Sequence, residues 1–282
     1  MPAPAGDREL KRLIVCADDF GLDPAVNEAV EEAHRRGILS TASLMVGAPA
    51  AADAAARARR LPGLAVGLHL VLVDGQPLAA EPGKGLVRAD GAFECNLGRA
   101  ALRMALRPAV RRQLAREIRA QFEAFCATGL MLDHVNAHKH MHLHPTVARL
   151  IVELGGDYGM RAVRVPDEPT APLRRAFPGE RYPPPLYRPW VAALRRRLAR
   201  AGFATNDHVF GIAWSGGMVE DRILRLLPHL PDGVSEIYCH PAAAAAGRGD
   251  RRREELAALL SARVKERIAE LGIALIRYRD LG

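Results

Sequence analysis

Residues 131–145 read M-L-D-H-V-N-A-H-K-H-M-H-L-H-P and hold five of the ten histidines of the chain: His134, His138, His140, His142 and His144. An apolar run, 129–132, leads into this stretch and Pro145 closes it, which predicts a short buried strand that ends in a polar loop. In α/β proteins a functional site is usually built beyond the carboxyl ends of the strands. Single histidines are often ordinary surface or core residues, but five together would repel one another as cations. Because neutral imidazole is a metal ligand, we expect at least one of them to bind metal.

The composition indicates a folded chain with a sizeable core. Its 282 residues are 49% hydrophobic, which argues against global disorder and suffices for one large α/β domain or two small ones. The net charge of +8 would suit an anionic membrane surface or nucleic acid as a partner. No arm of alternating basic and aromatic residues is present, so we do not expect nucleic-acid binding.

The cysteines and the chain start point to a reducing compartment. The four cysteines are far apart and form no C-x-x-C motif, which argues against a disulfide framework or a structural zinc knot: Cys16, Cys95, Cys126 and Cys239. The first ten residues lack the apolar segment of a signal peptide, and no run of eighteen apolar residues occurs. We therefore expect a cytoplasmic protein without a membrane span.

Strand-like and helix-like segments alternate along the chain. Apolar runs predict strands at 12–17, 39–46, 64–72, from 130 into the histidine-rich stretch, and at 162–165, 209–214, 235–239 and 273–276. Helical patterns occur at 24–36, 50–60, 108–128, 146–154, 219–230 and 251–271. This alternation is typical of a parallel sheet with crossover helices. We expect an α/β fold, a distorted (β/α) TIM-like barrel of about seven parallel strands, as a single domain over residues 1–282.

A segment at about 170–206 breaks this alternation and is dense in proline and arginine. Its second half predicts a basic amphipathic helix with Trp190, Val191, Leu194 and Leu198 on one side. Such a helix can lie on an anionic membrane, which predicts peripheral contact through residues 183–203. The alternative is a lid over the site whose arginines are merely solvated.

Polar residues follow several of the predicted strands, and in a barrel they would converge on one face: Asp18, Asp19, His69, the histidine-rich stretch, Arg164 and His240. Asp23 and Pro24 already supply the cap of the next helix, which leaves the adjacent acids free for other work. One carboxylate and two imidazoles form a ligand set for a divalent ion with open positions, and imidazole favours zinc over magnesium. A second carboxylate can act as a base and a further histidine as an acid, which describes hydrolysis of an amide or ester.

Six motifs, in this order and over nearly the whole chain, carry a family resemblance: A-D-D-F-G (17–21), G-L-H-L (67–70), D-H-V-N-A-H-K-H-M-H (133–142), R-V-P (164–166), G-I-A-W-S-G (211–216) and C-H-P (239–241). Together they resemble the YdjC-type carbohydrate deacetylases, relatives of the chitooligosaccharide deacetylases with a distorted TIM-like barrel. Within that family the chain looks most similar to the branch associated with hopanoid biosynthesis.

The resemblance implies a role for each matching residue. Asp19, His69 and His138 would ligate a divalent metal, with zinc preferred on ligand grounds and Mg²⁺ as the alternative. Asp18 would be the general base, His240 would protonate the leaving amine, and Arg164 would keep Asp18 ionised. His134, His140 and His142 would support the ligands or contact the sugar. If the loop is registered differently here, His140 or His142 replaces His138 as the ligand.

The implied reaction removes the N-acetyl group of N-acetylglucosaminyl bacteriohopanetetrol and gives the free glucosamine and acetate. The partner is then a glycosylated hopanoid lipid at the inner membrane surface, with Tyr187 and Trp190 among its contacts, and we expect a homodimer. One alternative is a deacetylase of soluble chitooligosaccharides or another N-acetyl sugar. A second is another metal-dependent hydrolase, such as a phosphoesterase, although that class favours more bridging carboxylates than this stretch offers. A sugar-binding module without activity would not need both Asp18 and Asp19.

Overall fold

The computed structural model describes residues 11–81, 83–182, 185–244 and 250–281. The strands are β1 (Arg12–Phe20), β2 (Thr41–Leu44), β3 (Ala65–Leu70), β4 (Leu132–Ala137), β5 (His208–Phe210), β6 (Val234–Cys239) and β7 (Ala274–Ile276). The helices are α1 (Pro24–Arg36), α2 (Ala51–Arg59), α3 (Leu97–Leu106), α4 (Pro108–Ala127), α5 (Pro145–Gly155), α6 (Thr170–Ala176), α7 (Arg188–Arg200), α8 (Glu220–Leu226), α9 (Arg252–Leu260) and α10 (Ala262–Glu270).

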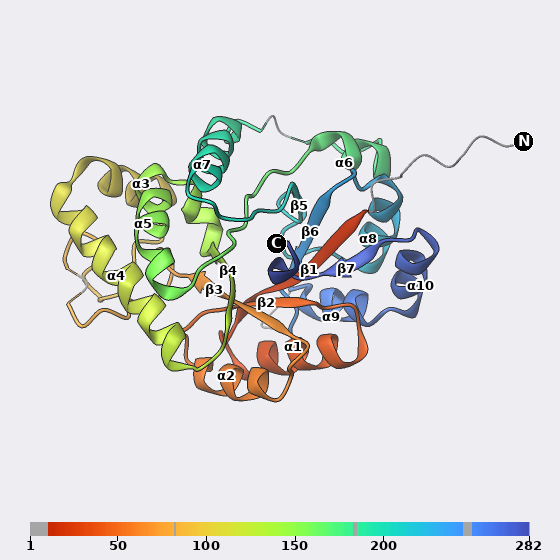
Figure 1. Cartoon of the computed structure of the whole chain (residues 1–282), viewed down its shortest axis with the longest axis horizontal. Helices are drawn as coiled ribbons and strands as arrows, with labels where there is room; N and C mark the ends of the chain where they lie inside the picture. The colour runs from red at the N-terminus through yellow and green to blue at the C-terminus, as the bar shows by residue number, and fades with distance from the viewer. Residues whose placement is uncertain (1–10, 82, 183–184, 245–249, 282) are drawn as a thin grey trace, which may run out of the picture.

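The strands form one parallel sheet in the order β4-β3-β2-β1-β6-β5, curled into a half-barrel with the helices around it (Figure 1). β6 pairs with β1 from Arg12 to Ala17 on one edge. On the other edge β7 pairs with the first residues of β1, and β2 takes over from Cys16 onward. The predicted α/β fold, a distorted TIM-like barrel of about seven parallel strands, is confirmed.

The helices begin and end where local chemistry dictates. α1 begins at Pro24 behind the cap of Asp23, whose carboxylate accepts a hydrogen bond from the backbone N–H of Val26 at 2.9 Å. The apolar side chains of α4 at helical spacing are buried, as expected: Leu114, Ile118, Phe122 and Phe125. The single helix expected over 251–271 is wrong. Ser261 has an extended backbone and its hydroxyl accepts from the N–H of Val264, so it ends α9 and caps α10.

Three strand predictions differ from the structure. The strand predicted at 209–214 is β5, which ends at Phe210. The segment 162–165 forms only isolated bridges, Val135 with Val163 and Ala162 with Ala204, because it spans the open side of the half-barrel next to β4. β4 begins at Leu132 and runs through the polar residues to Ala137, instead of ending where the apolar run ends. Its polar side chains are accommodated because the interior of the half-barrel holds partners for them.

The segment at 170–206 contains α6 and α7. Three apolar residues of α7 are buried in the protein: Val191, Leu194 and Leu198. Leu186 and Trp190 are exposed by 78% and 48%. Contact of Leu194 and Leu198 with a membrane, as the sequence pattern suggested, is therefore wrong, because these side chains pack in the core. Pro183 and Pro184 lie outside the described residues. None of the helices in the described part of the chain is both long and apolar enough to cross a membrane.

Candidate metal centre and active site

Three potential metal ligands meet at the carboxyl ends of β1, β3 and β4. Asp19 comes from β1, His69 from β3, and His138 directly follows β4. The Asp19 Oδ1 atom lies 3.3 Å from His69 Nε2 and 3.3 Å from His138 Nδ1. All three ligand atoms lie within 4.8 Å of one another. His138, and not His140 or His142, is the histidine of the loop that joins Asp19 and His69 in this group.

The arrangement of these atoms fits a divalent metal ion. Oxygen or nitrogen ligands about 2.0–2.1 Å from a tetrahedral zinc lie about 3.3–3.4 Å from each other, close to the observed separations. Asp19 Oδ1 and His69 Nε2 are buried and have no hydrogen-bond partner with acceptable geometry. Two buried polar atoms left unsatisfied are costly unless something else engages them. The set of one carboxylate and two imidazoles leaves a coordination position open for a reactant.

The local backbone aims these side chains into the site. The register of β1 against β2 shifts between Ala17 and Phe20, which marks a bulge that carries Asp19. Asp19 has a φ of 62°, and after His138 both Lys139 and His140 are also left-handed, with φ values of 51° and 53°. Such conformations cost about 1–3 kcal/mol each and persist where the surroundings hold them. The strained backbone thus lies at the ligand Asp19 and directly after the ligand His138.

Asn136 connects the ligand group to the neighbouring carboxylate. His69 Nδ1 lies 2.6 Å from Asn136 Oδ1, while Asn136 Nδ2 donates to Asp18 Oδ1 at 3.2 Å and to Ser43 Oγ at 2.9 Å. Because a carboxylate only accepts, the amide nitrogen must face Asp18 and the amide oxygen must face His69. His69 then carries its proton on Nδ1, and the Nε2 lone pair faces Asp19. Asn136 thus fixes the tautomer that a metal ligand requires.

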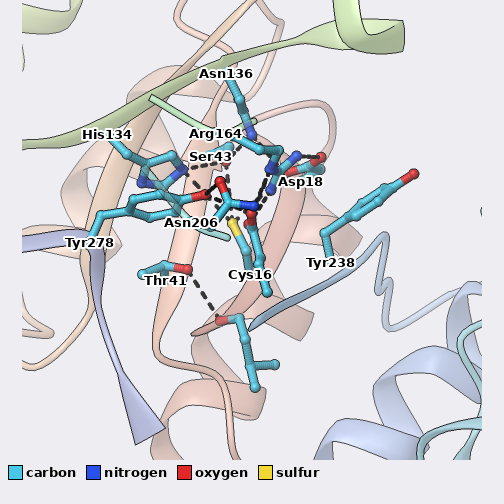
Figure 2. Close-up of polar contacts among 12 residues, drawn as sticks. Cys16, Asp18, Thr41, Ser43, His134, Asn136, Arg164, Asn206, Tyr238 and Tyr278 are labelled. Carbon is cyan, nitrogen blue, oxygen red and sulfur yellow. Dashed lines mark hydrogen bonds and ion pairs between the residues drawn. The ribbon is translucent and has the colours of Figure 1, made fainter. Parts of the chain in front are cut away.

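Asp18, the residue before the ligand Asp19, belongs to a buried ion network around Arg164 (Figure 2). Arg164 donates to both oxygens of Asp18, at 2.6 and 2.9 Å, and to both oxygens of Glu236, at 2.6–3.1 Å. Tyr278 donates to Glu236 Oε2 at 2.6 Å. Burial raises the pKa of Asp18, but Arg164, His69 and His240 lower it by more, so this pKa lies well below its usual value. Asp18 is held as a carboxylate.

We expect Arg164→Leu to lower the free energy of unfolding by about 3–5 kcal/mol, because it leaves Asp18 and Glu236 buried without a counter-charge. Arg164 is fully buried, so water cannot replace it. The matched control is Arg35→Leu, which removes an exposed i,i+4 pair with Glu31 and should cost about 0.3–0.5 kcal/mol. Urea unfolding followed by circular dichroism measures both. Equal losses in the two variants would contradict a structural role for the network.

His240 follows β6 on the other side of β1 from the ligand group. Its backbone N–H donates to Glu255 Oε2 at 2.6 Å, and the same carboxylate accepts from the N–H of Met218 at 2.8 Å. Glu255 is fully buried in α9 and fixes the start of the loop that carries His240. Burial is the largest influence on the pKa of both Asp18 and Asp19, and raises it. The charge of His240 is among the influences that oppose burial and lower both pKa values overall, and its ring packs edge-on against the ring of Tyr238, with centroids 5.6 Å apart.

The other four histidines of the stretch have separate environments. His134 is fully buried, with Nδ1 3.0 Å from Asp133 Oδ2 and Nε2 3.0 Å from Ser43 Oγ, which fits the supporting role. Gly67 permits this packing, because a Cβ there would lie 2.5 Å from the His134 ring. His144 lies away from the ligand group, where its side chain caps α5.

His140 and His142 pack against each other, with ring centroids 5.9 Å apart. Burial lowers the pKa of His140 to about 3 and holds that of His142 well below its usual value. Both are therefore neutral, which removes the repulsion expected among clustered cations. His140 Nε2 also lies 3.3 Å from the hydroxyl of Tyr238, a residue of β6. Of the two candidate lipid contacts, Tyr187 packs partly against the core, and Trp190 stays largely exposed.

The sequence interpretation missed several residues that hold the site together: Cys16, Ser43, Asn136, Glu236, Tyr238 and Glu255. A glutamate inside the apolar strand 234–239 was a usable signal, because a buried carboxylate requires a partner. Asn136 was detectable as well, because it shares one face of β4 with His134, two residues earlier, and lies two residues before His138.

Comparisons with known proteins agree along nearly the full length. A family model described as YdjC-like protein matches residues 12–270. The carbohydrate deacetylase of Geobacillus stearothermophilus is 34% identical, over 95% of this chain and 96% of its own length. The chitooligosaccharide deacetylase of Serratia marcescens is 31% identical, over 96% and 99%. A crystal structure from Enterococcus faecalis V583, provisionally described as a cellobiose-phosphate cleavage protein, is 26% identical. It superimposes with a TM-score of 0.77 over 97% of this chain and 99% of that one.

Proposed function

The chain belongs to the YdjC-like protein family, and from this premise we propose that it is a metal-dependent carbohydrate N-deacetylase. The observation that carries the proposal is the group of Asp19, His69 and His138, whose ligand atoms lie within 4.8 Å of one another, next to the buried carboxylate of Asp18. Two relatives with about one third identity are named as carbohydrate or chitooligosaccharide deacetylases. The described residues contain a single such group, with one carboxylate, which does not favour a two-metal phosphoesterase.

The proposed roles follow from the positions of the side chains. Asp19, His69 and His138 would hold a divalent ion, with zinc preferred by the imidazole ligands. When bound, such an ion supplies Lewis acidity toward an amide carbonyl and acidifies water. Asp18, kept ionised by Arg164, accepts the proton of the attacking water, and His240 donates a proton to the amine that leaves. Asn136 contacts both side chains and holds Asp18 as the base and His69 as a metal ligand in the orientations that these roles require.

For the substrate we propose the N-acetylglucosamine-bearing hopanoid, N-acetylglucosaminyl bacteriohopanetetrol. The support is the surface of the 170–206 segment, where Leu186 and Trp190 are exposed next to the arginine-rich outer face of α7. An apolar tip beside basic side chains suits an anionic membrane that holds a lipid substrate. The segment would then serve as the membrane contact of a single deacetylase domain.

Product analysis tests both levels of the proposal. Acetate and free amine are measured with N-acetylglucosaminyl bacteriohopanetetrol in vesicles and with diacetylchitobiose, after addition of zinc or magnesium to the metal-free protein. Faster turnover of the lipid supports the hopanoid substrate. Preference for diacetylchitobiose would replace it with the soluble alternative, and release of acetate from neither would overturn the deacetylase proposal.

We expect the double variant Leu186→Ser, Trp190→Ser to lower kcat/KM on the vesicle-bound lipid by about tenfold or more, and on a soluble N-acetylglucosaminide far less. Burial of one large apolar side chain contributes about 1.5–3 kcal/mol, and each 1.4 kcal/mol is about tenfold. Removing the whole segment is a poorer test, because Val191, Leu194 and Leu198 belong to the core. Met131→Ser is the matched control: its side chain is 71% exposed just before β4, at the opposite end of the sheet from the site. Equal losses on both substrates would exclude a membrane role.

A further inference from the structure

A cavity of about 320 Å³ adjoins the metal-ligand group. Asp19 and His138 line it on one side. The remaining wall comes from Gln121 of α4 and from the loops that follow β1, β2 and β3, with Leu22, Met45 and Leu78 among their residues. The cavity is thus continuous with the position where the carbonyl of a substrate would lie.

The lining of this cavity suits an alkyl group better than a sugar. Gln121 is occupied, because its amide donates to the carbonyl of Val71 at 2.7 Å and accepts from the N–H of Val71 at 2.9 Å. Asp74 is paired with Lys139. Asp74 and Gln76, the other polar side chains of these loops, are exposed, so they could serve a sugar only at the solvent side of the cavity. Aliphatic side chains, in contrast, gain from covering carbon.

The order of the strands indicates which part of the substrate lies on which side of β1. β6, which carries His240, borders β1 on one side, whereas β2 and β3, whose loops form the cavity, lie on the other. In amide hydrolysis water adds to the carbonyl carbon and the C–N bond breaks. The acyl part leaves as a carboxylate, and the nitrogen leaves as an amine with an added proton. If His240 serves the nitrogen, the sugar extends toward β6 and the acyl chain extends toward β2 and β3.

We propose that this cavity is the acyl pocket and that it admits linear acyl groups longer than acetyl; this inference rests on the proposed deacetylase function. A methyl group occupies roughly the volume of one water molecule, about 30 Å³. The cavity is several times larger than that. The enzyme therefore removes propionyl and butyryl groups from an aminosugar as well as acetyl.

Gly47 provides the test, because it lines the cavity and a Cβ there would meet only the Leu78 side chain, at 3.7 Å, and more distant atoms. Gly47→Leu extends a side chain into the pocket, and Leu78→Trp fills it from the neighbouring position should the first variant fold poorly. Leu78→Ala enlarges it. The backbone N–H of Leu78 is held by Glu117, so these side-chain changes leave the loop anchored. The kcat/KM values for N-acetyl-, N-propionyl- and N-butyrylglucosaminides are compared in each protein.

In the unaltered protein we expect the butyryl substrate to react within about tenfold of the acetyl one. One methylene in a pocket is worth about 10- to 200-fold, so either filling variant should lower the butyryl-to-acetyl ratio at least about tenfold, while Leu78→Ala raises it. A butyryl group rejected by the unaltered protein, or filling variants that leave the ratio unchanged, would overturn the acyl pocket while acetate release keeps the deacetylase proposal intact. If the filling variants instead lose kcat/KM on N-acetylated chitooligosaccharides, and the loss grows with the number of sugar units, the cavity binds the sugar. No turnover of any acyl substrate would overturn both.

Discussion

Replacement of Asp18 by asparagine is expected to lower kcat by about 10²- to 10⁴-fold, the usual contribution of a positioned base, while metal content stays near that of the unaltered protein. Asp18 is not among the three ligand residues, so the change leaves Asp19, His69 and His138 in place. It removes the carboxylate that Arg164 and Asn136 hold beside them. Acetate release under saturating substrate and metal analysis of the purified variant are the two measurements.

Glu236→Gln is the matched control for this prediction. Glu236 binds the same guanidinium as Asp18, but it is fully buried within β6 and also accepts the hydroxyl of Tyr278. Its removal perturbs the network without removing the base, so we expect a much smaller loss of kcat. If Asp18→Asn kept most of its activity, or if both variants lost it equally, Asp18 would be a structural partner of Arg164 and not the base.

The sequence was sufficient to predict the order of the elements and which strand ends carry chemistry. Asp19, His69 and His138 lie 50 to 119 residues from one another along the chain, but each stands at the carboxyl end of a parallel strand. Those ends meet at one edge of a sheet, so the sequence pattern predicts that the three converge. The network around Arg164 was only partly predictable in this way. Arg164 was expected beside Asp18, because it follows a predicted strand within the R-V-P motif, but no local pattern indicates that Glu236 is its second partner.

Local patterns also do not show what covers an apolar face. The spacing of Val191, Leu194 and Leu198 correctly predicts an amphipathic helix, α7. The same spacing fits a membrane, a partner or the core of the protein, and the structure places these residues in the core. Likewise, polar letters in residues 133–136 read as a loop, although they form a buried strand. Asp133, His134 and Asn136 find their partners on elements far away in sequence, at Arg279, Ser43 and Asp18.

A graded loss of metal affinity is expected from two substitutions on neighbouring strands. His69→Ala removes a ligand and should abolish stoichiometric zinc binding. Asn136→Leu keeps all three ligands but leaves the Nδ1–H of His69 without its acceptor, so Nδ1 and Nε2 compete for the proton. Loss of such a supporting partner typically weakens metal binding about 10- to 100-fold. Competition with a chromophoric zinc chelator measures the affinity of each variant without reference to activity.

His144→Asn is the control within the same stretch, because His144 lies outside the ligand group and asparagine retains the capping function at the start of α5. Its zinc affinity should equal that of the unaltered protein. Stoichiometric zinc in His69→Ala would place the metal elsewhere in the chain. Unchanged affinity in Asn136→Leu would mean that the 2.6 Å contact with His69 does not set the tautomer. We expect the zinc affinity of Asn136→Leu to lie between those of the control and of His69→Ala. That order would show that the Asn136 amide, which also binds Asp18, supports the metal site.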